Sequence, residues 1–375
     1  MLGVVSLCAD ATYEGARSVT GAFLGSLGAT GTVVGLVAGV GELIGYSLRL
    51  ATGYLSDRLR KYWGITTLGY FVNTAVVPLM ALAGRWEVAA GLMIAERTGK
   101  AIRTPPRDVL LSHAASRVGR GFGFGLHEAM DQIGATIGPL MVAAMLGGQY
   151  GYRGAFAVLA IPAIIGLVVL LVGQRIYPNP SEFEANTQDL KGEALPKIYW
   201  VYLVAIALVA AGYADFPLIA FHLQQKSIES VERIPLLYAV AMGVDAIAAL
   251  FFGRWFDRIG LLSLAIGVVI SSLFAPLVFF GNSSLVLLGM VLWGIGMGAQ
   301  ESLMKAAVAG MVPPERRGSA FGIFNTGYGL AWFLGSAFMG ILYDRSLTVL
   351  VIFSVAIQLI AIPILIIVNK QLHRP

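Results

Sequence analysis

Charge is scarce in this sequence. Only 13% of its 375 residues are Asp, Glu, Lys or Arg, whereas a typical soluble domain has about 25%. Hydrophobic residues make up 57% of the chain, and the mean hydropathy is +0.77. A soluble core of this size cannot hide so much apolar surface, so lipid must surround most of it. The composition excludes an ordinary soluble protein and predicts an integral membrane protein.

Cysteine and known catalytic motifs are also missing. Cys8 is the single cysteine, which excludes an intramolecular disulfide. The first apolar segment carries Asp10, Glu14 and Arg17, and these charges argue against a cleavable signal peptide. There is no HExxH, CxxC, GxSxG or phosphate-binding-loop sequence. We therefore expect neither an enzyme nor a bound cofactor or metal.

Long apolar runs fill most of the chain. A spanning helix needs roughly 20 apolar residues, and the length accommodates twelve such helices with short loops. The first six are predicted near 2–28, 31–54, 63–83, 87–105, 121–147 and 152–174. The second six are predicted near 198–224, 233–254, 260–281, 284–310, 318–343 and 347–369. The prediction is an all-α membrane protein with an N-terminal six-helix bundle (1–174), a cytoplasmic linker (175–197) and a C-terminal six-helix bundle (198–375).

Basic residues are distributed unevenly between the predicted loops. With the N-terminus in the cytoplasm, the inner loops and tail hold 16 Lys and Arg residues and the outer loops hold 5. Lys and Arg accumulate on the cytoplasmic side of membrane proteins. We therefore expect a multi-pass plasma (cytoplasmic) membrane protein with both termini cytoplasmic. The net charge of +5 reflects this orientation signal, and we do not expect nucleic-acid binding.

Two short motifs recur in the two halves. GYLSDRLRK follows the second span and GRWFDRIG follows the eighth, so that Asp57 corresponds to Asp257 at an offset of 200 residues. A second match has an offset of 197 and joins spans five and eleven. It aligns Arg120, Gly121, Phe124, Gly125 and Gly138 with Arg317, Gly318, Phe321, Gly322 and Gly335. The halves therefore read as an internal repeat of six helices.

The first motif resembles the loop sequence G-x-L-S/A-D-R-x-G-R-R/K that follows the second span of major facilitator superfamily transporters. It matches at Gly53, Leu55, Ser56, Asp57, Arg58 and Lys61. Arg60 stands where the family has glycine, whereas the second copy keeps Gly260. TIGPL at 136–140 resembles the glycine–proline motif of the family's fifth span. The region from Glu96 to Pro139 resembles a broad prokaryotic subgroup of mostly unassigned substrate.

The resemblance implies a carrier whose two bundles rock about a midplane site, usually as a monomer. It also implies that Asp57 and Arg58 latch the cytoplasmic ends of the halves through a modest, breakable interaction. The alternative is a solvated turn that needs Gly53 for close packing. Lys100 and Arg103 are either gate residues or orientation charges. The gating candidates are Gly53, Asp57, Arg58, Lys100, Arg103, Asp257 and Arg258.

Ionisable residues are concentrated within spans of the N-terminal half. Such residues are costly in a membrane unless they pair or face a cavity. Helical spacing places Asp10, Glu14 and Arg17 on one face, and His127 and Asp131 one turn apart. They either bind substrate and protons or form permanent ion pairs between helices. The substrate and proton candidates are Asp10, Glu14, Arg17, Glu42, Glu96, Arg97, His127, Glu128, Asp131, Asp215, Asp245 and Glu301.

Arg17, Glu128 and Asp131 are the foremost candidates, because they lie far from the predicted ends of spans that line the cavity in the superfamily. We expect a proton-coupled secondary transporter of a small polar or charged organic solute, and the buried arginines favour an anionic group. The alternatives are proton-driven efflux of amphipathic drugs or metabolites, a metal or metal-chelate carrier, and a non-transporting membrane receptor. The expected partners are the solute, protons and the lipid bilayer.

Overall fold

The computed structural model describes residues 1–116, 120–178, 195–313 and 316–372, with side chains at all of these positions except 57, 112–116, 120–125 and 317–318. Helices are the only regular elements in these ranges. The predicted all-α fold class is therefore confirmed.

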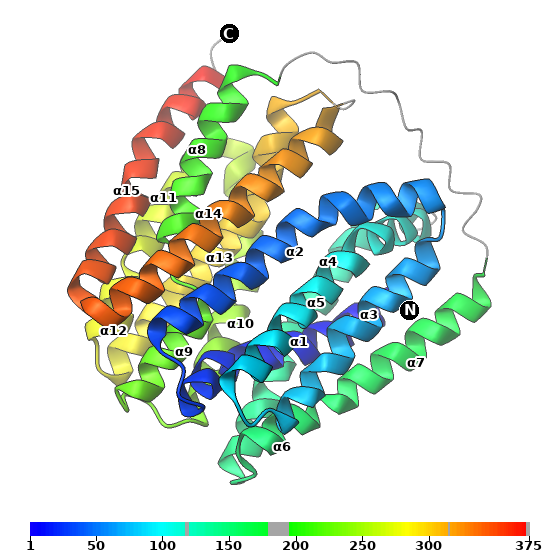
Figure 1. Cartoon of the computed structure of the whole chain (residues 1–375). Coiled ribbons are helices and arrows are strands. Elements are labelled where there is room, and N and C mark those ends of the chain that lie inside the picture. The colour runs from blue at the N-terminus through cyan, green and yellow to red at the C-terminus, as the bar shows by residue number, and fades with distance from the viewer. Residues whose placement is uncertain (117–119, 179–194, 314–315, 373–375) are drawn as a thin grey trace. The chain divides into compact units, whose positions relative to one another are not determined.

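Twelve membrane helices are formed by the described residues (Figure 1). The first six comprise α1 (Leu2–Ser26), α2 (Gly31–Leu59), α3 (Tyr62–Leu79) with the 3-10 turn η1 (Met80–Leu82), α4 (Trp86–Ser116), α5 (Arg120–Gly147), and α6 (Gly151–Val158) with α7 (Ala160–Ile176). The other six comprise α8 (Lys197–Gly212) with α9 (Phe216–Gln225), α10 (Arg233–Ile259), α11 (Leu262–Ser272) with α12 (Phe274–Phe280), α13 (Ser283–Met311), α14 (Arg317–Arg345) and α15 (Leu347–Leu372).

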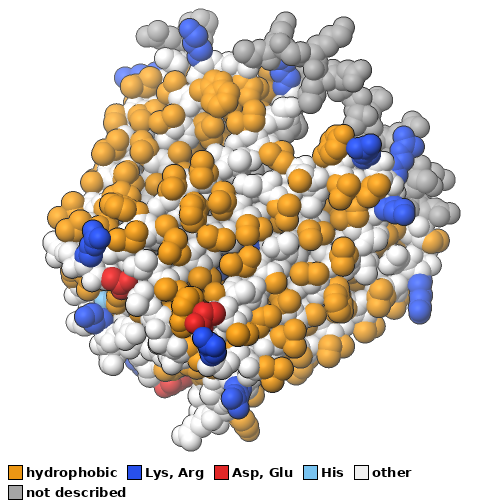
Figure 2. Space-filling model, viewed as in Figure 1, with side chains coloured by type: hydrophobic (Ala, Val, Ile, Leu, Met, Phe, Trp, Pro, Cys, Tyr) orange, Lys and Arg blue, Asp and Glu red, His pale blue; other side chains and the backbone are white. Residues whose placement is uncertain are grey.

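Most of these helices present apolar side chains outward. Nine spans among the described residues are long and apolar enough to cross a membrane. On α7, Ile161, Ile164, Ile165 and Val168 are exposed at helical spacing, and such a stripe requires a lipid or protein partner. Figure 2 shows hydrophobic side chains spread over the viewed face, where charged side chains are few.

Backbone packing divides the chain into two compact units. Unit 1 comprises Met1–Ala29, Val40–Asn186 and Leu223–Ala239, and unit 2 comprises Thr30–Gly39, Thr187–His222 and Val240–Pro375. The first turns of α2 thus pack in unit 2, and the first turns of α10 pack in unit 1. The bundle boundaries at 174 and 198 remain a prediction, and residues 179–194 of the predicted linker lie outside the described residues.

The repeat read from the sequence has a physical counterpart in the helix contacts. In unit 1, α1 packs on α5, and a Cβ added at Gly138 would lie 2.1 Å from the carbonyl oxygen of Ala11. In unit 2, α8 packs on α14, and a Cβ at Gly335 would lie 2.2 Å from the carbonyl oxygen of Ala211. Glycine is needed at both positions because the facing backbone occupies the space of a side chain.

The two repeated Asp-Arg motifs lie in helices, and this corrects the prediction that they form loops. α2 continues to Leu59 and α10 continues to Ile259. The chain turns at Arg60, with φ of 52°, and at the equivalent Gly260, with φ of 59°. Glycine adopts this left-handed backbone without steric cost, which accounts for the glycine of the superfamily motif at the position of Arg60. Gly53 is helical, and a Cβ there would make an ordinary 3.6 Å contact with Pro105.

α4 is longer than predicted. The sequence places the end of this span near residue 105, but the helix passes through Pro105 and Pro106 to Ser116. A proline cannot donate to the carbonyl four residues earlier. The Thr52 hydroxyl of α2 donates to the Ala101 carbonyl at 3.0 Å and replaces the hydrogen bond that Pro105 cannot make. A contact between helices thus sustains a helix that local propensity would end.

Candidate functional site

Five charged side chains of α1, α2 and α4, three buried carboxylates and two largely buried arginines, form one chain of ion pairs in unit 1. Glu42 lies at its centre, 3.4 Å from Arg17 and 3.1 Å from Arg97. Arg17 also lies 4.0 Å from Glu14, and Arg97 lies 3.5 Å from Glu96. Three carboxylates thus share two guanidinium groups. The chain carries one excess negative charge when all of its members are ionised.

Neutral side chains hold both ends of this chain. The Tyr238 hydroxyl of α10 donates to Glu14, and the Asn73 amide of α3 donates to Glu96 at 2.7 Å. Asn73 also donates to the Glu96 carbonyl at 3.1 Å. Hydrogen bonds to a carboxylate offset part of the cost of burying it. The network therefore extends over five helices.

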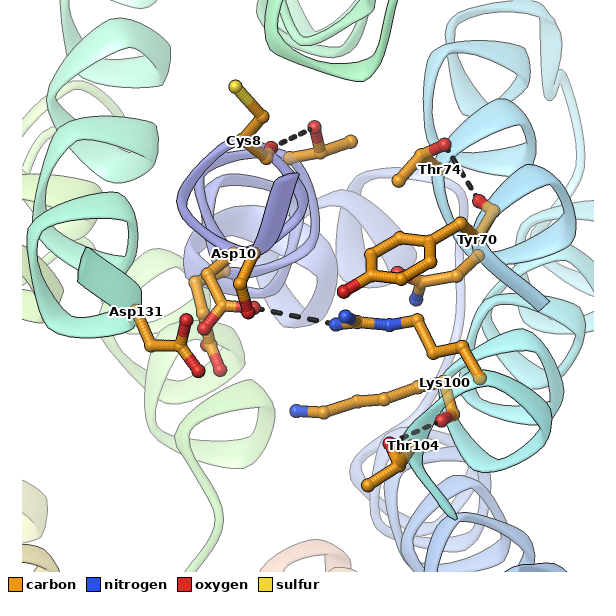
Figure 3. Close-up of polar contacts among 12 residues, drawn as sticks. Cys8, Asp10, Tyr70, Thr74, Lys100, Thr104 and Asp131 are labelled. Carbon is orange, nitrogen blue, oxygen red and sulfur yellow. Dashed lines mark hydrogen bonds and ion pairs between the residues drawn. The ribbon is translucent and has the colours of Figure 1, made fainter. Parts of the chain in front are cut away.

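A second ion pair joins α1 and α4. An Arg103 nitrogen lies 3.4 Å from an Asp10 oxygen, a contact drawn as a dashed line from the labelled Asp10 in Figure 3. Arg103 is only 1% exposed. The guanidinium lies over the Tyr70 ring at 4.4 Å. Its Nε and Nη1 atoms have no hydrogen-bond partner in the described part of the chain. A fully enclosed pair of this kind is costly to break, so we assign it a structural role.

A third group lies where α5 faces α1 and α4. His127 Nε2 is 3.6 Å from Asp131 Oδ2, as the four-residue spacing predicted. Neither ring nitrogen of His127 has a hydrogen-bond partner among the residues described, and Asp131 Oδ1 has none there either. Nearby, Arg107 pairs with Asp108 at 2.7 Å and reaches Ser6 at 3.4 Å. Asp131 is therefore less tightly paired than the carboxylates that contact arginine.

Lys100 lies between these groups. Its ammonium is 3.8 Å from the centre of the Tyr13 ring, and the residue is partly exposed. Figure 3 shows the side chain reaching from α4 toward α1 and α5, which carry Asp10 and Asp131. Arg49 of α2 similarly lies over the Tyr46 ring at 5.0 Å. Both cations contact aromatic faces, and no ion pair of either is found within the described ranges.

Other predicted residues of the N-terminal half lie apart from these pairs. Glu128 is exposed, although the sequence ranked it with Arg17 and Asp131. Arg58 is exposed as well, and the side chain of Asp57 lies outside the described residues. In the second motif, Asp257 and Arg258 are exposed at the end of α10. The gating role of both motifs stays a prediction.

The three acids predicted in the C-terminal half belong to unit 2. Asp215 is buried in the break between α8 and α9, where its Oδ1 accepts from the Phe216 backbone at 2.9 Å. This bond caps the start of α9. Asp245 is buried in α10, whereas Glu301 is exposed on α13.

Unit 2 contains a ladder of buried aromatic rings. Tyr202 stacks on Phe324 at 6.1 Å, and Phe324 stacks on Tyr328 at 6.1 Å. Trp332 continues the ladder at 5.5 Å from Tyr328 and 5.9 Å from Tyr213. The indole Nε1 of Trp332 has no hydrogen-bond partner in the part of unit 2 that is described. The ladder is built from aromatic rings, whereas the groups described in unit 1 are built from charged side chains.

Sequence reasoning missed the neutral partners of the charges. Asn73 is a lone amide in the apolar run YFVNTAVV, and that isolation was a usable signal. Tyr13 lies three residues after Asp10, so helical spacing also pointed to it. Tyr238 lies 224 residues from Glu14, and no local pattern indicates that contact. Across the described residues, no group of three or more His, Cys, Asp or Glu side chains is arranged to hold a metal ion.

Comparison with known proteins assigns the family. The sequence model of the Major Facilitator Superfamily matches residues 2–336 and 216–374. The chain belongs to this superfamily. It is therefore a multi-pass membrane protein of a transporter family, as the sequence motifs predicted.

Relatives of this superfamily member cover nearly the whole chain. An uncharacterised protein of Mycobacterium tuberculosis is 43% identical over 369 residues, covering 96% of this chain and 90% of the relative. An uncharacterised MFS-type transporter of Methanocaldococcus jannaschii is 27% identical over 356 residues, covering 92% and 88%. The crystal structure of the nucleoside transporter NupG matches with a TM-score of 0.72 at 12% identity, covering 99% of this chain and 97% of that one. At this identity the likeness concerns the fold alone.

Proposed function

We propose that this protein is a proton-coupled secondary transporter of a small organic solute with an anionic group. The observation that carries the proposal is the chain of ion pairs around Glu42 in unit 1. Burying several charges is a poor way to stabilise a fold, since desolvation offsets most of the attraction. Ionisable residues inside membrane helices instead mark substrate and proton pathways.

In such a network an arginine can exchange a carboxylate of the protein for an anionic group of the solute. Glu42 divides its charge between two arginines, so an anionic solute that binds an arginine leaves a carboxylate short of its cation. That carboxylate then gains affinity for a proton. His127 and Asp131 add a second place where a proton is taken up. Solute binding and proton binding are thereby coupled through shared partners.

The superfamily fold supports alternating access as the transport cycle. In this cycle the Asp257 and Arg258 motif and its first-half counterpart act at the cytoplasmic ends of α10 and α2. Both termini lie in the cytoplasm of the plasma-membrane protein, as the Lys and Arg distribution favours. The protein works as a monomer. The structural match NupG is a nucleoside transporter, so nucleosides belong among the solutes to be tested.

Efflux of amphipathic compounds is the second candidate function. The aromatic ladder of unit 2, from Tyr202 to Trp332, favours it, because stacked rings bind planar apolar groups. The solute of this second function would be a lipophilic cation. The sign of the solute's charge separates the two functions.

Transport by reconstituted protein tests the proposal. The full chain is placed in liposomes with an imposed pH gradient, and the panel contains organic anions, lipophilic cations, nucleosides and divalent metals. We expect an organic anion to accumulate against its gradient and a protonophore to abolish the accumulation. Accumulation or extrusion of lipophilic cations alone would support the efflux candidate. A proton-independent flux would contradict the proposed coupling.

A further inference from the structure

Lys100 differs from the arginines that surround it. Arg17, Arg97 and Arg103 each have a carboxylate oxygen at 3.1 to 3.4 Å. No carboxylate among the described residues lies within 4.0 Å of the Lys100 ammonium, and no hydrogen bond of this group is found there. An ammonium in a membrane helix without an anionic partner is costly. Lys100 is thus available to an anionic partner that the described residues do not supply.

The Tyr13 ring is the contact that now stabilises this charge. The 3.8 Å separation from the ring centre is a cation–π geometry, which is worth about 0.5–2 kcal/mol. An ion pair in the same dry surroundings is stronger and replaces such a contact readily. Lys100 is also partly exposed, whereas Arg103 is enclosed. A solute that reaches this unit can therefore touch Lys100 but not Arg103.

Charges of both signs surround Lys100. Arg97 and Arg49 repel the ammonium, whereas Glu14 and Asp10 attract it from beyond ion-pair distance. Both of these acids have other partners, since Glu14 accepts from Tyr238 and Asp10 pairs with Arg103. An anion bound to Lys100 therefore also meets Arg97 and Arg49, while the two nearest acids are already engaged by other partners.

The shape of the donor group indicates the class of anion. Lys100 offers one compact ammonium. The guanidinium forks of Arg17, Arg97 and Arg103 already contact carboxylates, and the fork of Arg49 lies over the Tyr46 ring of its own helix. A phosphate group is bound best by several cations or by a free arginine fork. A single carboxylate needs only one cation. Building on the proposed transport function, we propose that Lys100 binds the carboxylate of a monocarboxylic solute, and thus belongs to the substrate site.

Thermal unfolding of the purified full chain with matched probes tests this assignment. The probes are benzoate with its neutral counterpart benzamide, nicotinate with nicotinamide, and phenyl phosphate. We expect a carboxylate, but not its amide, to stabilise the protein. Lys100→Gln should raise the dissociation constant at least about tenfold, while Lys100→Arg should keep part of the affinity. The control Lys226→Gln removes an exposed charge outside the site and should bind as the unchanged protein does.

The single cysteine allows a rescue experiment that does not depend on how well Lys100→Gln folds. In a Cys8→Ser background, Lys100→Cys provides the only thiol. Treatment with 2-aminoethyl methanethiosulfonate restores an ammonium there and should restore carboxylate binding, whereas methyl methanethiosulfonate should not.

The outcomes separate the two proposals. Equal carboxylate affinity in Lys100→Gln would overturn the assignment of Lys100 and leave the transport function standing. Stabilisation by phenyl phosphate alone would overturn the monocarboxylate class. Absence of both stabilisation and flux with every anion would overturn the anionic transport function itself.

Discussion

Replacing Gly138 with alanine tests the closest helix contact of unit 1. The added Cβ would lie 2.1 Å from the Ala11 carbonyl oxygen and 2.9 Å from the Gly15 nitrogen. Both atoms are backbone, so α1 and α5 must separate to make room. Overpacking of this kind costs about 1–3 kcal/mol. Alanine gains about 1 kcal/mol of helix propensity over glycine, so we expect a net loss of up to about 2 kcal/mol.

The matched control is Gly91→Ala in α4, where nothing lies within 4 Å of the added Cβ. This variant keeps the propensity gain without the clash and should be as stable as the unchanged protein or slightly more so. Thermal unfolding in detergent, followed by intrinsic fluorescence, measures both. Gly138→Ala should unfold at a lower temperature than the control. If both variants unfold together, the proposed backbone contact between α1 and α5 is wrong.

Two further predictions concern carboxylates with assigned partners. Asp344 accepts from the Gly31 and Thr32 backbone nitrogens at 2.9 and 2.8 Å. Asp344→Ala should therefore remove an N-terminal cap worth about 0.5–2 kcal/mol and speed amide hydrogen exchange in the first turn of α2. Unchanged exchange would contradict the capping role. Asp10→Asn should cost about 3–5 kcal/mol because it leaves Arg103 buried without its carboxylate. Adding Arg103→Met should recover stability, and a double variant no better than the single one would argue against a structural pair.

The positions of the helices were largely predictable from the sequence, whereas the partners of the charges were not. Lipid imposes a minimum apolar length on each span, and that length is visible in one dimension. The contact between His127 and Asp131 was also visible, because four residues are about one helical turn. By contrast, the pairing of Glu42 with Arg97 depends on how α2 and α4 pack, and sequence spacing carries no such information.

The errors have the same origin. The extension of α4 past Pro105 depends on a hydroxyl of Thr52, which lies 49 residues from its acceptor. Glu128 ranked high because it lies in mid-span beside His127, yet one residue corresponds to about 100° of rotation on a helix. Glu128 is exposed as a result, while His127 is buried. Depth within a span was predictable, but the direction of a side chain was less so.

Charge balance connects Lys100 to the proposed proton coupling. Among the side chains that the structure describes, the partly or fully buried charges of α1, α2 and α4, together with Asp131, comprise six carboxylates and six cations, leaving aside His127 and the exposed Glu128. They are Asp10, Glu14, Glu42, Glu96, Asp108 and Asp131 against Arg17, Arg49, Arg97, Lys100, Arg103 and Arg107.

A monocarboxylate that binds Lys100 therefore adds an uncompensated negative charge to a balanced set. Burying such a charge in surroundings of low polarity costs several kcal/mol, and one proton removes that cost. Asp131 is the carboxylate best placed to take it up, because no Arg or Lys nitrogen among the described residues lies within 4.0 Å of it, whereas Glu42 and Asp10 contact arginines. The positive charges of Lys100, Arg103 and Arg107 on α4 attract the ionised carboxylate of Asp131. The negative charge of Asp10 on α1 repels it. The balance thus favours one proton for each monocarboxylate, and a dicarboxylate would need two.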